Sequence, residues 1–244
     1  MTHALCALLL LVLGTVSASA QADVDYDAWD TLLKSAVINE QVSYGQWRDN
    51  PTFDALVEQV GSADTTDMTR QEQLVFYINA YNILAAQGIL AGGSPSSLLG
   101  RWAYFKRDKY TVGGQEINLY DLEHELIRPL NEPRIHFAIV CASTSCPILR
   151  AEAYTLDRLD QQLDDAARTF INDTRRNRFN AASREAGLSK IFDWFTEDFE
   201  TPAGSLQVYL ADYVADPEAA ALLREEGMQI KYLKYDWNLN GTLN

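Results

Sequence analysis

The chain has 244 residues, of which 47% are hydrophobic and 22% charged, a composition typical of one globular domain and not of a disordered or fibrous protein. The 34 acidic residues outnumber the 20 basic ones, which gives a formal net charge of −14, and no block of Lys or Arg interrupts the chain. We therefore expect neither nucleic acid nor anionic lipid as a partner. No apolar run after the N-terminal segment reaches the roughly 20 residues that cross a bilayer, so we expect no integral membrane span.

The first 20 residues have the pattern of a cleavable export signal. An apolar run over residues 4–13 is followed by small residues up to Ala20. We predict a signal peptide over residues 1–20, and an exported, periplasmic or extracellular, single domain over residues 21–244. Cleavage removes one cysteine and one histidine, so that all remaining cysteines and histidines lie between positions 124 and 146.

Helical periodicity and capping residues predict a mainly helical first half. We expect a helix over residues 26–36, a short strand over 41–44, a helix from Asn50-Pro51 to about Val60, and a helix from the capping box Thr69-Arg70-Gln71-Glu72 to about Leu90. The last of these helices is apolar nearly all round, so we expect it to be buried. Asn79 and Asn82 lie within it and need hydrogen-bond partners there, either as structural supports or as site residues.

Beyond residue 90, the sequence predicts both strands and helices. We expect a hairpin over 110–117 turning at Gly113-Gly114, a helix over 119–128 capped by Asn118, a helix over 156–173 capped by Thr155, two short helices within 205–226, and a closing strand over 229–237. The apolar run over residues 134–141 predicts a central strand buried on both faces. Its alternation would place His136 and Cys141 on opposite faces, which makes Cys146 the better cysteine partner for His136. We therefore predict a helix-rich α/β or α+β fold packed around a small sheet.

Five motifs follow one another along the chain. They are Ile78-Asn79-Ala80-Tyr81-Asn82, Asp121-Leu122-Glu123-His124, the segment from His136 to Pro147, Ile191-Phe192-Asp193-Trp194-Phe195, and Tyr235-Asp236-Trp237. Together they resemble the family called domain of unknown function 547, over most of residues 70–240. The resemblance implies a compact helix-rich α/β domain, often exported in bacteria, and it implies no particular activity.

One interpretation of these residues is a cysteine-dependent hydrolase or acyl transferase acting on amides or thioesters. Cys146 would be the nucleophile and His136 its base, and Asn79, in preference to Asn82 or Asp193, would orient the base, since a thiolate needs such neighbours. Further candidates for lining the site are Cys141, Asn82, Glu123, His124, Ser145, Asp193 and Trp194. The segment from Cys141 to Pro147 resembles the short cysteine signature of papain-like enzymes, in which the cysteine precedes the histidine. Here both histidines precede Cys146, so the signature does not transfer.

The alternative is a noncatalytic exported domain that binds another protein or a ligand, the ligand being a small molecule or peptide-like. Cys141 and Cys146 would then form a structural disulfide, as expected for an even cysteine count in an oxidising compartment. His136 would be a hydrogen-bonded core residue, and the aromatic and acidic segment 192–199 would be the binding wall. A zinc site that joins both cysteines to His124 and His136 would need a distorted strand, so we expect no metal. The chain lacks phosphate-binding and dinucleotide-binding motifs, and we expect no cofactor.

Overall fold

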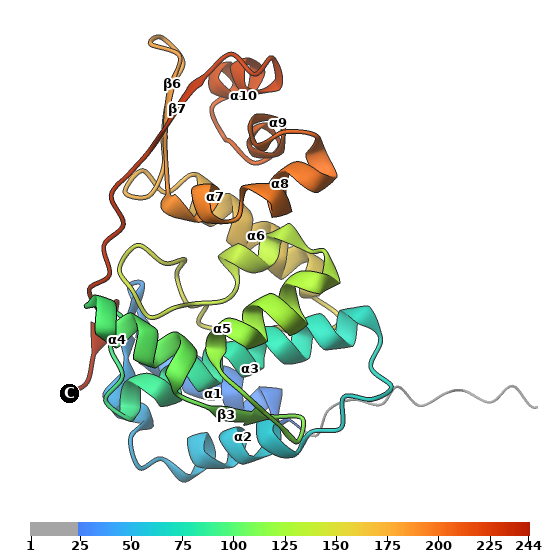
Figure 1. The fold of residues 1–244 in the computed structure, drawn as a ribbon, viewed down its shortest axis with the longest axis vertical. Helices are drawn as coiled ribbons and strands as arrows, with labels where there is room; N and C mark the ends of the chain where they lie inside the picture. The colour runs from blue at the N-terminus through green and yellow to red at the C-terminus, as the bar shows by residue number, and fades with distance from the viewer. Residues whose placement is uncertain (1–23) are drawn as a thin grey trace, which may run out of the picture.

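The computed structural model describes residues 24–244, and the predicted export signal lies outside this range. Two lobes are stacked along the long axis of the molecule, with the N-terminal helices in one and the C-terminal helices in the other (Figure 1). The buried apolar side chains form two clusters, one within residues 24–163 and one mainly within residues 166–228. No helix in the described range combines the length and the apolar character needed to cross a membrane.

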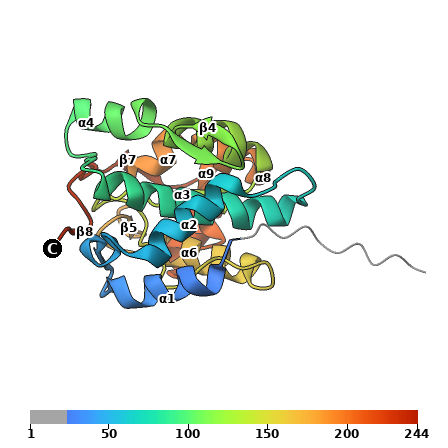
Figure 2. The same cartoon turned by 90° about the horizontal axis from the view of Figure 1, so that it is seen from below.

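The predicted elements of the N-terminal half are confirmed. They are α1 (Tyr26–Ala36), β2 (Gln41–Ser43), α2 (Pro51–Ser62), α3 (Arg70–Leu90), and the hairpin of β3 (Tyr110–Val112) and β4 (Gln115–Ile117). α3 begins at the predicted capping box, in which the Thr69 hydroxyl accepts from the Glu72 N–H and the Glu72 carboxylate accepts from the Thr69 N–H. α3 is buried along almost its whole length, and it packs beside α2 (Figure 2).

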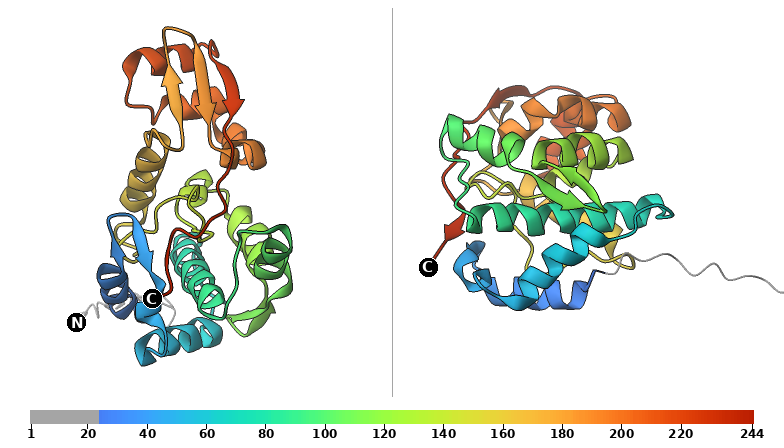
Figure 3. Two further views of the ribbon diagram at one scale, coloured as in Figure 1. Left: turned by 90° about the vertical axis from the view of Figure 1, so that its left-hand side faces the viewer. Right: turned by 60° about the horizontal axis from the view of Figure 1, so that its bottom comes forward.

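Each of two three-stranded sheets pairs strands that are distant in the sequence. The first has the order β1 (Val37–Ile38), β2, β8 (Gly241–Thr242), and the second has the order β5 (Arg178–Asn180), β6 (Glu185–Leu188), β7 (Gln229–Tyr232). In each sheet the last pair is parallel and the first is antiparallel. The chain leaves β7 in one lobe and runs along the molecule to β8 in the other (Figures 1 and 3). The predicted closing strand is therefore shorter than expected, since it ends at Tyr232.

The chain also forms several further short helices. They are η1 (Tyr44–Trp47), α4 (Leu98–Trp102), η2 (Ala103–Arg107), α7 (Lys190–Trp194), α8 (Thr196–Ala203), α9 (Leu206–Ala211) and α10 (Pro217–Arg224). α9 and α10 are the two short helices predicted within residues 205–226. The helix-rich α/β or α+β class predicted from the sequence is thus confirmed.

The buried central strand predicted over residues 134–141 is wrong. Pro133–Phe137 forms a 3₁₀ helix, η5, and residues 138–142 belong to none of the described strands. The side chain of Asn82 on α3 satisfies this backbone in place of a neighbouring strand. Its Nδ2 donates to the Ala138 carbonyl at 3.0 Å, and its Oδ1 accepts from the Val140 N–H at 2.9 Å. The run is apolar because helices bury it, and an apolar run of this length does not distinguish that case from a buried strand.

The helix predicted over residues 156–173 begins later than expected, and Thr155 is not its cap. α6 covers Leu159–Ile171. Gln162, from inside α6, binds the preceding segment: its Nε2 donates to the Ala153 carbonyl at 2.8 Å and its Oε1 accepts from the Thr155 N–H at 3.0 Å. Residues 153–155 therefore lie against the side of the helix instead of at its start.

The helix predicted over residues 119–128 is present as three consecutive segments. Asn118 caps α5 (Leu119–Asp121) as expected, η3 (Leu122–Ile127) is a π-helix, and η4 (Arg128–Leu130) is a 3₁₀ helix. The hydrogen bonds of a π-helix span five residues instead of four. Ile127, five residues after the buried Leu122, is buried accordingly, whereas Leu126 is only partly buried. η2 is a second π-helix. Such turns are frequent at functional sites, and both of these border the cavity described next.

Candidate functional site

A cavity of about 520 Å³ is lined by residues from both halves of the chain. Its aromatic lining is Tyr81, Trp102, Phe105, Tyr120, Trp194, Phe195, Tyr235 and Trp237. Its ionisable lining is Arg101, Lys106, Glu123, His124 and His136, and the two cysteines Cys141 and Cys146 complete one side. A mostly apolar cavity of this size with a few polar groups is typical of a site for a small organic ligand.

Stacked rings form one wall of the cavity. The Trp194 ring lies 5.5 Å from that of Trp237 at an interplanar angle of 24°, and both pack against Tyr235 at 4.8 and 4.5 Å. The Arg101 guanidinium lies 4.6 Å from the centre of the Trp237 ring. Trp102 and Trp194 remain 52% and 46% exposed, so large aromatic surfaces are left open to a ligand.

A second aromatic group lies beside the π-helices. The His124 ring stacks on Tyr120 with a centroid distance of 3.8 Å, and the Lys106 Nζ lies 3.8 Å from the same tyrosine ring. His124 Nδ1 is 2.9 Å from the Tyr120 carbonyl, to which it donates as N–H. Burial lowers the pKa of His124, and the nearby cations Arg128 and Lys106 lower it further. His124 therefore faces the cavity, and its imidazole is neutral at neutral pH.

His136 is held by a network that is anchored on α8. Its side chain is 1% exposed, and its Nε2 lies 2.7 Å from Asp198 Oδ2. Arg128 donates two hydrogen bonds of 2.7 Å to the same carboxylate, one from Nε and one from Nη2. The Phe195 ring stacks on the imidazole with a centroid distance of 4.0 Å. These contacts fix both the position and the orientation of the ring.

The network also fixes the protonation state of His136. Burial raises the pKa of Asp198, but hydrogen bonds from Arg128 and His136 outweigh this effect and hold that pKa well below its usual range. Burial lowers the pKa of His136, against the opposing effect of Asp198. At neutral pH we therefore assign a neutral imidazole that donates its proton from Nε2 to the Asp198 carboxylate, which leaves Nδ1 unprotonated.

Glu123 faces the other nitrogen of the same ring. Its Oε1 lies 3.9 Å from His136 Nδ1. Burial raises the pKa of Glu123 to about 8; Arg128 opposes this shift and Asp198 adds to it. One imidazole thus lies between a carboxylate and a carboxylic acid. Two titratable groups whose pKa values are driven apart by their surroundings are characteristic of acid and base sites.

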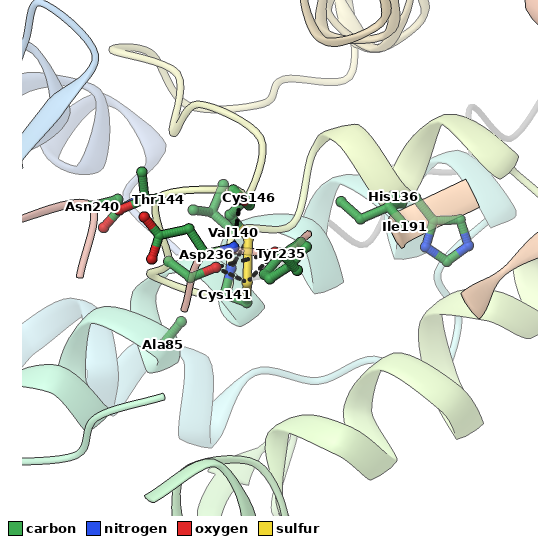
Figure 4. Close-up of a disulfide and its surroundings, with 12 residues drawn as sticks. Ala85, His136, Val140, Cys141, Thr144, Cys146, Ile191, Tyr235, Asp236 and Asn240 are labelled. Atoms are coloured by element: carbon green, nitrogen blue, oxygen red, sulfur yellow. Dashed lines mark hydrogen bonds between the residues drawn. A yellow bond between two sulfur atoms is a disulfide. The ribbon is translucent and has the colours of Figure 1, made fainter. Parts of the chain in front are cut away.

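Cys141 and Cys146 form a disulfide, with their Cα atoms 6.1 Å apart (Figure 4). Cys146 is buried, and the partly exposed Cys141 has its Sγ 3.3 Å from the Tyr235 hydroxyl. The His136 ring points away from the bridge (Figure 4), and no hydrogen bond in the described range joins it to either sulfur. The prediction that His136 and Cys141 lie on opposite faces of a strand is wrong, since both residues line one cavity.

The C-terminal segment secures the loop that carries the disulfide. The Asn240 N–H donates to the Ala142 carbonyl at 3.1 Å, and the Thr144 N–H donates to the Asn238 carbonyl at 2.7 Å. Ala142 is buried with φ +58°, a left-handed conformation that costs a non-glycine residue about 1 kcal/mol. Such a conformation persists only where surrounding contacts determine it, so the loop is rigidly held.

The structure brings together most of the predicted site residues. Those that line the cavity are Cys141, Cys146, Glu123, His124, His136 and Trp194. Asn79, Asn82, Ser145 and Asp193 lie outside its lining. Within residues 24–244, no group of three or more His, Cys, Asp or Glu side chains is arranged to hold a metal ion.

The residues outside the lining make structural contacts. Asn79 donates to the carbonyl groups of Val75 and Tyr154, so it supports the packing of α3 as Asn82 does. The Ser145 hydroxyl accepts from the Asp236 N–H at 2.9 Å, and Asp193 accepts from Lys190 Nζ at 2.8 Å.

Two residues of the site, Asp198 and Arg128, were not predicted from the sequence. Asp198 belongs to the aromatic and acidic segment 192–199, which the sequence analysis describes as a binding wall. The signal that could have identified Asp198 is its position four residues, about one helical turn, after Trp194. Arg128 reaches it from 70 positions away, so no local pattern connects the two.

Residues 65–171 match the model of a family described as protein of unknown function, DUF547. The chain contains a DUF547 domain. The resemblance read from the motifs is confirmed over this range. The DUF547 domain supplies Glu123, His136 and the disulfide. Two further residues lie beyond residue 171: Trp237 lines the cavity, and Asp198 binds His136 from outside the lining. No curated protein and no solved structure matches the chain significantly.

Proposed function

We propose that this chain is an exported domain that binds a small planar organic molecule in its aromatic cavity. The observation that carries the proposal is the set of eight aromatic side chains around a space of about 520 Å³. A planar ring stacked on such side chains gains about 0.5–1.5 kcal/mol per aromatic pair beyond the burial of its surface. The few polar groups of the lining would then orient the ligand.

The disulfide favours binding over cysteine-dependent hydrolysis. Only a thiolate is a nucleophile, so Cys146 would need prior reduction of its bridge to Cys141 before it could attack an amide or a thioester. The predicted base, His136, instead has its Nε2 hydrogen-bonded to Asp198 and its Nδ1 near the Glu123 carboxyl group. These contacts support a role of His136 that is independent of the cysteines.

Two features support export. The N-terminal segment has the pattern of a signal peptide, and disulfides persist mainly in oxidising compartments. Peptide mass spectrometry of the mature protein tests this part of the proposal. We expect an N-terminus at Gln21 and cysteines that alkylate only after reduction; a retained leader or two free thiols would count against export.

Calorimetric titration with 2-naphthol tests the binding proposal, since this bicyclic compound presents a planar aromatic surface. We expect saturable binding at one site. Trp194→Ala should weaken it about tenfold, because it removes one stacking partner worth about 1.4 kcal/mol. Leu156→Ala is the matched control, since Leu156 is similarly exposed, at 49%, and lies outside the cavity lining. No saturable binding, or equal weakening in the two variants, would refute the proposal.

A further inference from the structure

We infer that His136 and Glu123 form a proton-transfer site for a ring-bearing ketone, with His136 as the base and Glu123 as the acid. The inference rests on the proposed function, because the substrate is the molecule bound in the aromatic cavity. The reaction class is enolisation, the movement of one proton from a carbon atom to the neighbouring carbonyl oxygen. Both residues line the cavity and can therefore touch a bound molecule.

The surroundings of His136 are those of a general base. Its Nε2 is occupied by Asp198 at 2.7 Å, and its Nδ1 has no hydrogen-bond partner within residues 24–244. A carboxylate that binds one nitrogen of an imidazole fixes the tautomer and stabilises the cation that forms when the other nitrogen takes a proton. Arg128 and Asp198 are positioning residues in this scheme, since they act through the ring.

The surroundings of Glu123 are those of a general acid. Its side chain is 13% exposed, and its carboxyl group forms no hydrogen bond within the described range. In such a place the neutral carboxylic acid is favoured over the carboxylate. A protonated carboxyl group in an apolar cavity can donate to a carbonyl oxygen as negative charge develops there.

The two groups lie close enough together to act on neighbouring atoms of one bound ketone. His136 Nδ1 takes a proton from the carbon beside the carbonyl, and the electron pair of that C–H bond becomes the new C=C bond. The carbonyl π pair takes the Glu123 proton and becomes an O–H bond, which leaves an enol, an imidazolium and a carboxylate. Over the gap of 3.9 Å a small side-chain movement or one bridging water returns the proton from Nδ1 to Glu123. The cycle closes without an oxidant, a reductant or a second substrate.

The charged and titratable groups around the pair set its pH range. His136 faces Asp198 from α8, Arg128 from η4, and Glu123 and His124 from η3. The base is active when its imidazole is neutral, and the lowered pKa of His136 extends that state below pH 6.5. The acid is active while Glu123 keeps its proton, so the rate should fall as pH rises through about 8.

Exchange of the α-hydrogens of 2-tetralone in D₂O, followed by proton NMR, tests the inference, and calorimetry on the same samples measures binding. We expect exchange faster than in buffer, with a loss of at least about 100-fold in His136→Gln. Glu123→Gln should slow exchange and also remove its decline above pH 8, a change of pH profile that a structural role would not produce. Asp198→Asn should slow exchange while 2-tetralone still binds. Asp193→Asn, a carboxylate on the neighbouring helix α7 outside the lining, should leave the rate unchanged.

The outcomes separate the two proposals. If 2-tetralone binds but exchanges no faster than in buffer, or if His136→Gln exchanges it as fast as the wild type, the proton-transfer inference is overturned and the binding proposal stands. If 2-naphthol binds but 2-tetralone does not, the proton-transfer inference is overturned and the binding proposal stands. If neither compound binds, both are overturned. Should His136→Gln not fold, the pH profile of Glu123→Gln decides, since this variant keeps the side-chain shape and an unchanged profile rejects the acid role.

Discussion

Asp198 and Glu123 occupy opposite sides of the His136 imidazole in opposite protonation states. The Asp198 carboxylate lies 2.7 Å from Nε2, and the Glu123 carboxyl lies 3.9 Å from Nδ1. The difference has a physical cause, since Arg128 donates two hydrogen bonds to Asp198 and none to Glu123. Residues from the DUF547 domain and from the segment beyond it thus combine to give one ring two different neighbours.

Glu123→Gln should remove a pH dependence of stability. Burial raises the pKa of Glu123 in the folded state to about 8, from an ordinary value of 4.5, so between these values the folded state keeps a proton that the unfolded state has released. The stability supplied by this group is fully present below pH 4.5 and is lost as pH rises toward 8, by up to about 1.4 kcal/mol per pH unit. Urea unfolding at pH 5, 7 and 9 should show a difference between variant and wild type that grows with pH in favour of Gln. Parallel pH profiles would mean that Glu123 is not a buried acid.

Reduction of the Cys141–Cys146 bridge should lower the stability by about 2 kcal/mol, the chain-entropy value for so short a loop. The bridge closes the loop that holds Ala142 in its left-handed conformation, so its loss should also weaken binding of 2-naphthol. Calorimetric melting with and without a phosphine reductant measures the first effect. A variant with both cysteines changed to Ala is the control, because its melt should not respond to the reductant. An unchanged wild-type melt would leave the bridge without a stabilising role.

Asn82→Ala should destabilise the protein by about 2 kcal/mol, because it leaves the Ala138 carbonyl and the Val140 N–H buried without their partner. Gln71→Ala is a suitable comparison, since Gln71 is an exposed amide on the same helix whose side chain forms no hydrogen bond within residues 24–244, and this change should cost no more than about 0.5 kcal/mol. Urea unfolding of both variants gives the two free energies. Similar values would contradict the role of the Asn82 amide as a substitute for a strand.

Local signals predicted the elements whose ends are determined by their own residues. The Thr69 capping box and the Asn50-Pro51 start placed α3 and α2 correctly, since each cap is satisfied by residues within three positions. The run over residues 134–141 does not form the predicted strand. Two of its backbone groups pair with the side chain of Asn82, more than 50 positions away, and others pair within the segment. Thr155 was misread for a similar reason, since a glutamine from inside the helix binds its backbone.

The site was predicted in part for the same physical reason. His136, Cys141 and Cys146 are of residue types that are rare in this chain, which makes them conspicuous in the sequence, and they do line one cavity. Asp198 and Arg128 belong to a chain with many acids and bases, so composition gives them no prominence. Their role follows only from the folded structure, which brings Arg128 and His136 to the Asp198 carboxylate.

The tryptophan indole signals in a ¹H–¹⁵N NMR spectrum test the central claim, that the aromatic cavity is the binding site, most directly. Of the five tryptophans, Trp102, Trp194 and Trp237 line the cavity, whereas Trp29 and Trp47 pack against each other in the core, 5.3 Å apart. On titration with 2-naphthol, the three cavity signals should shift together and saturate with one Kd, while the two core signals stay in place. Equal shifts of all five signals, or none, would contradict the account.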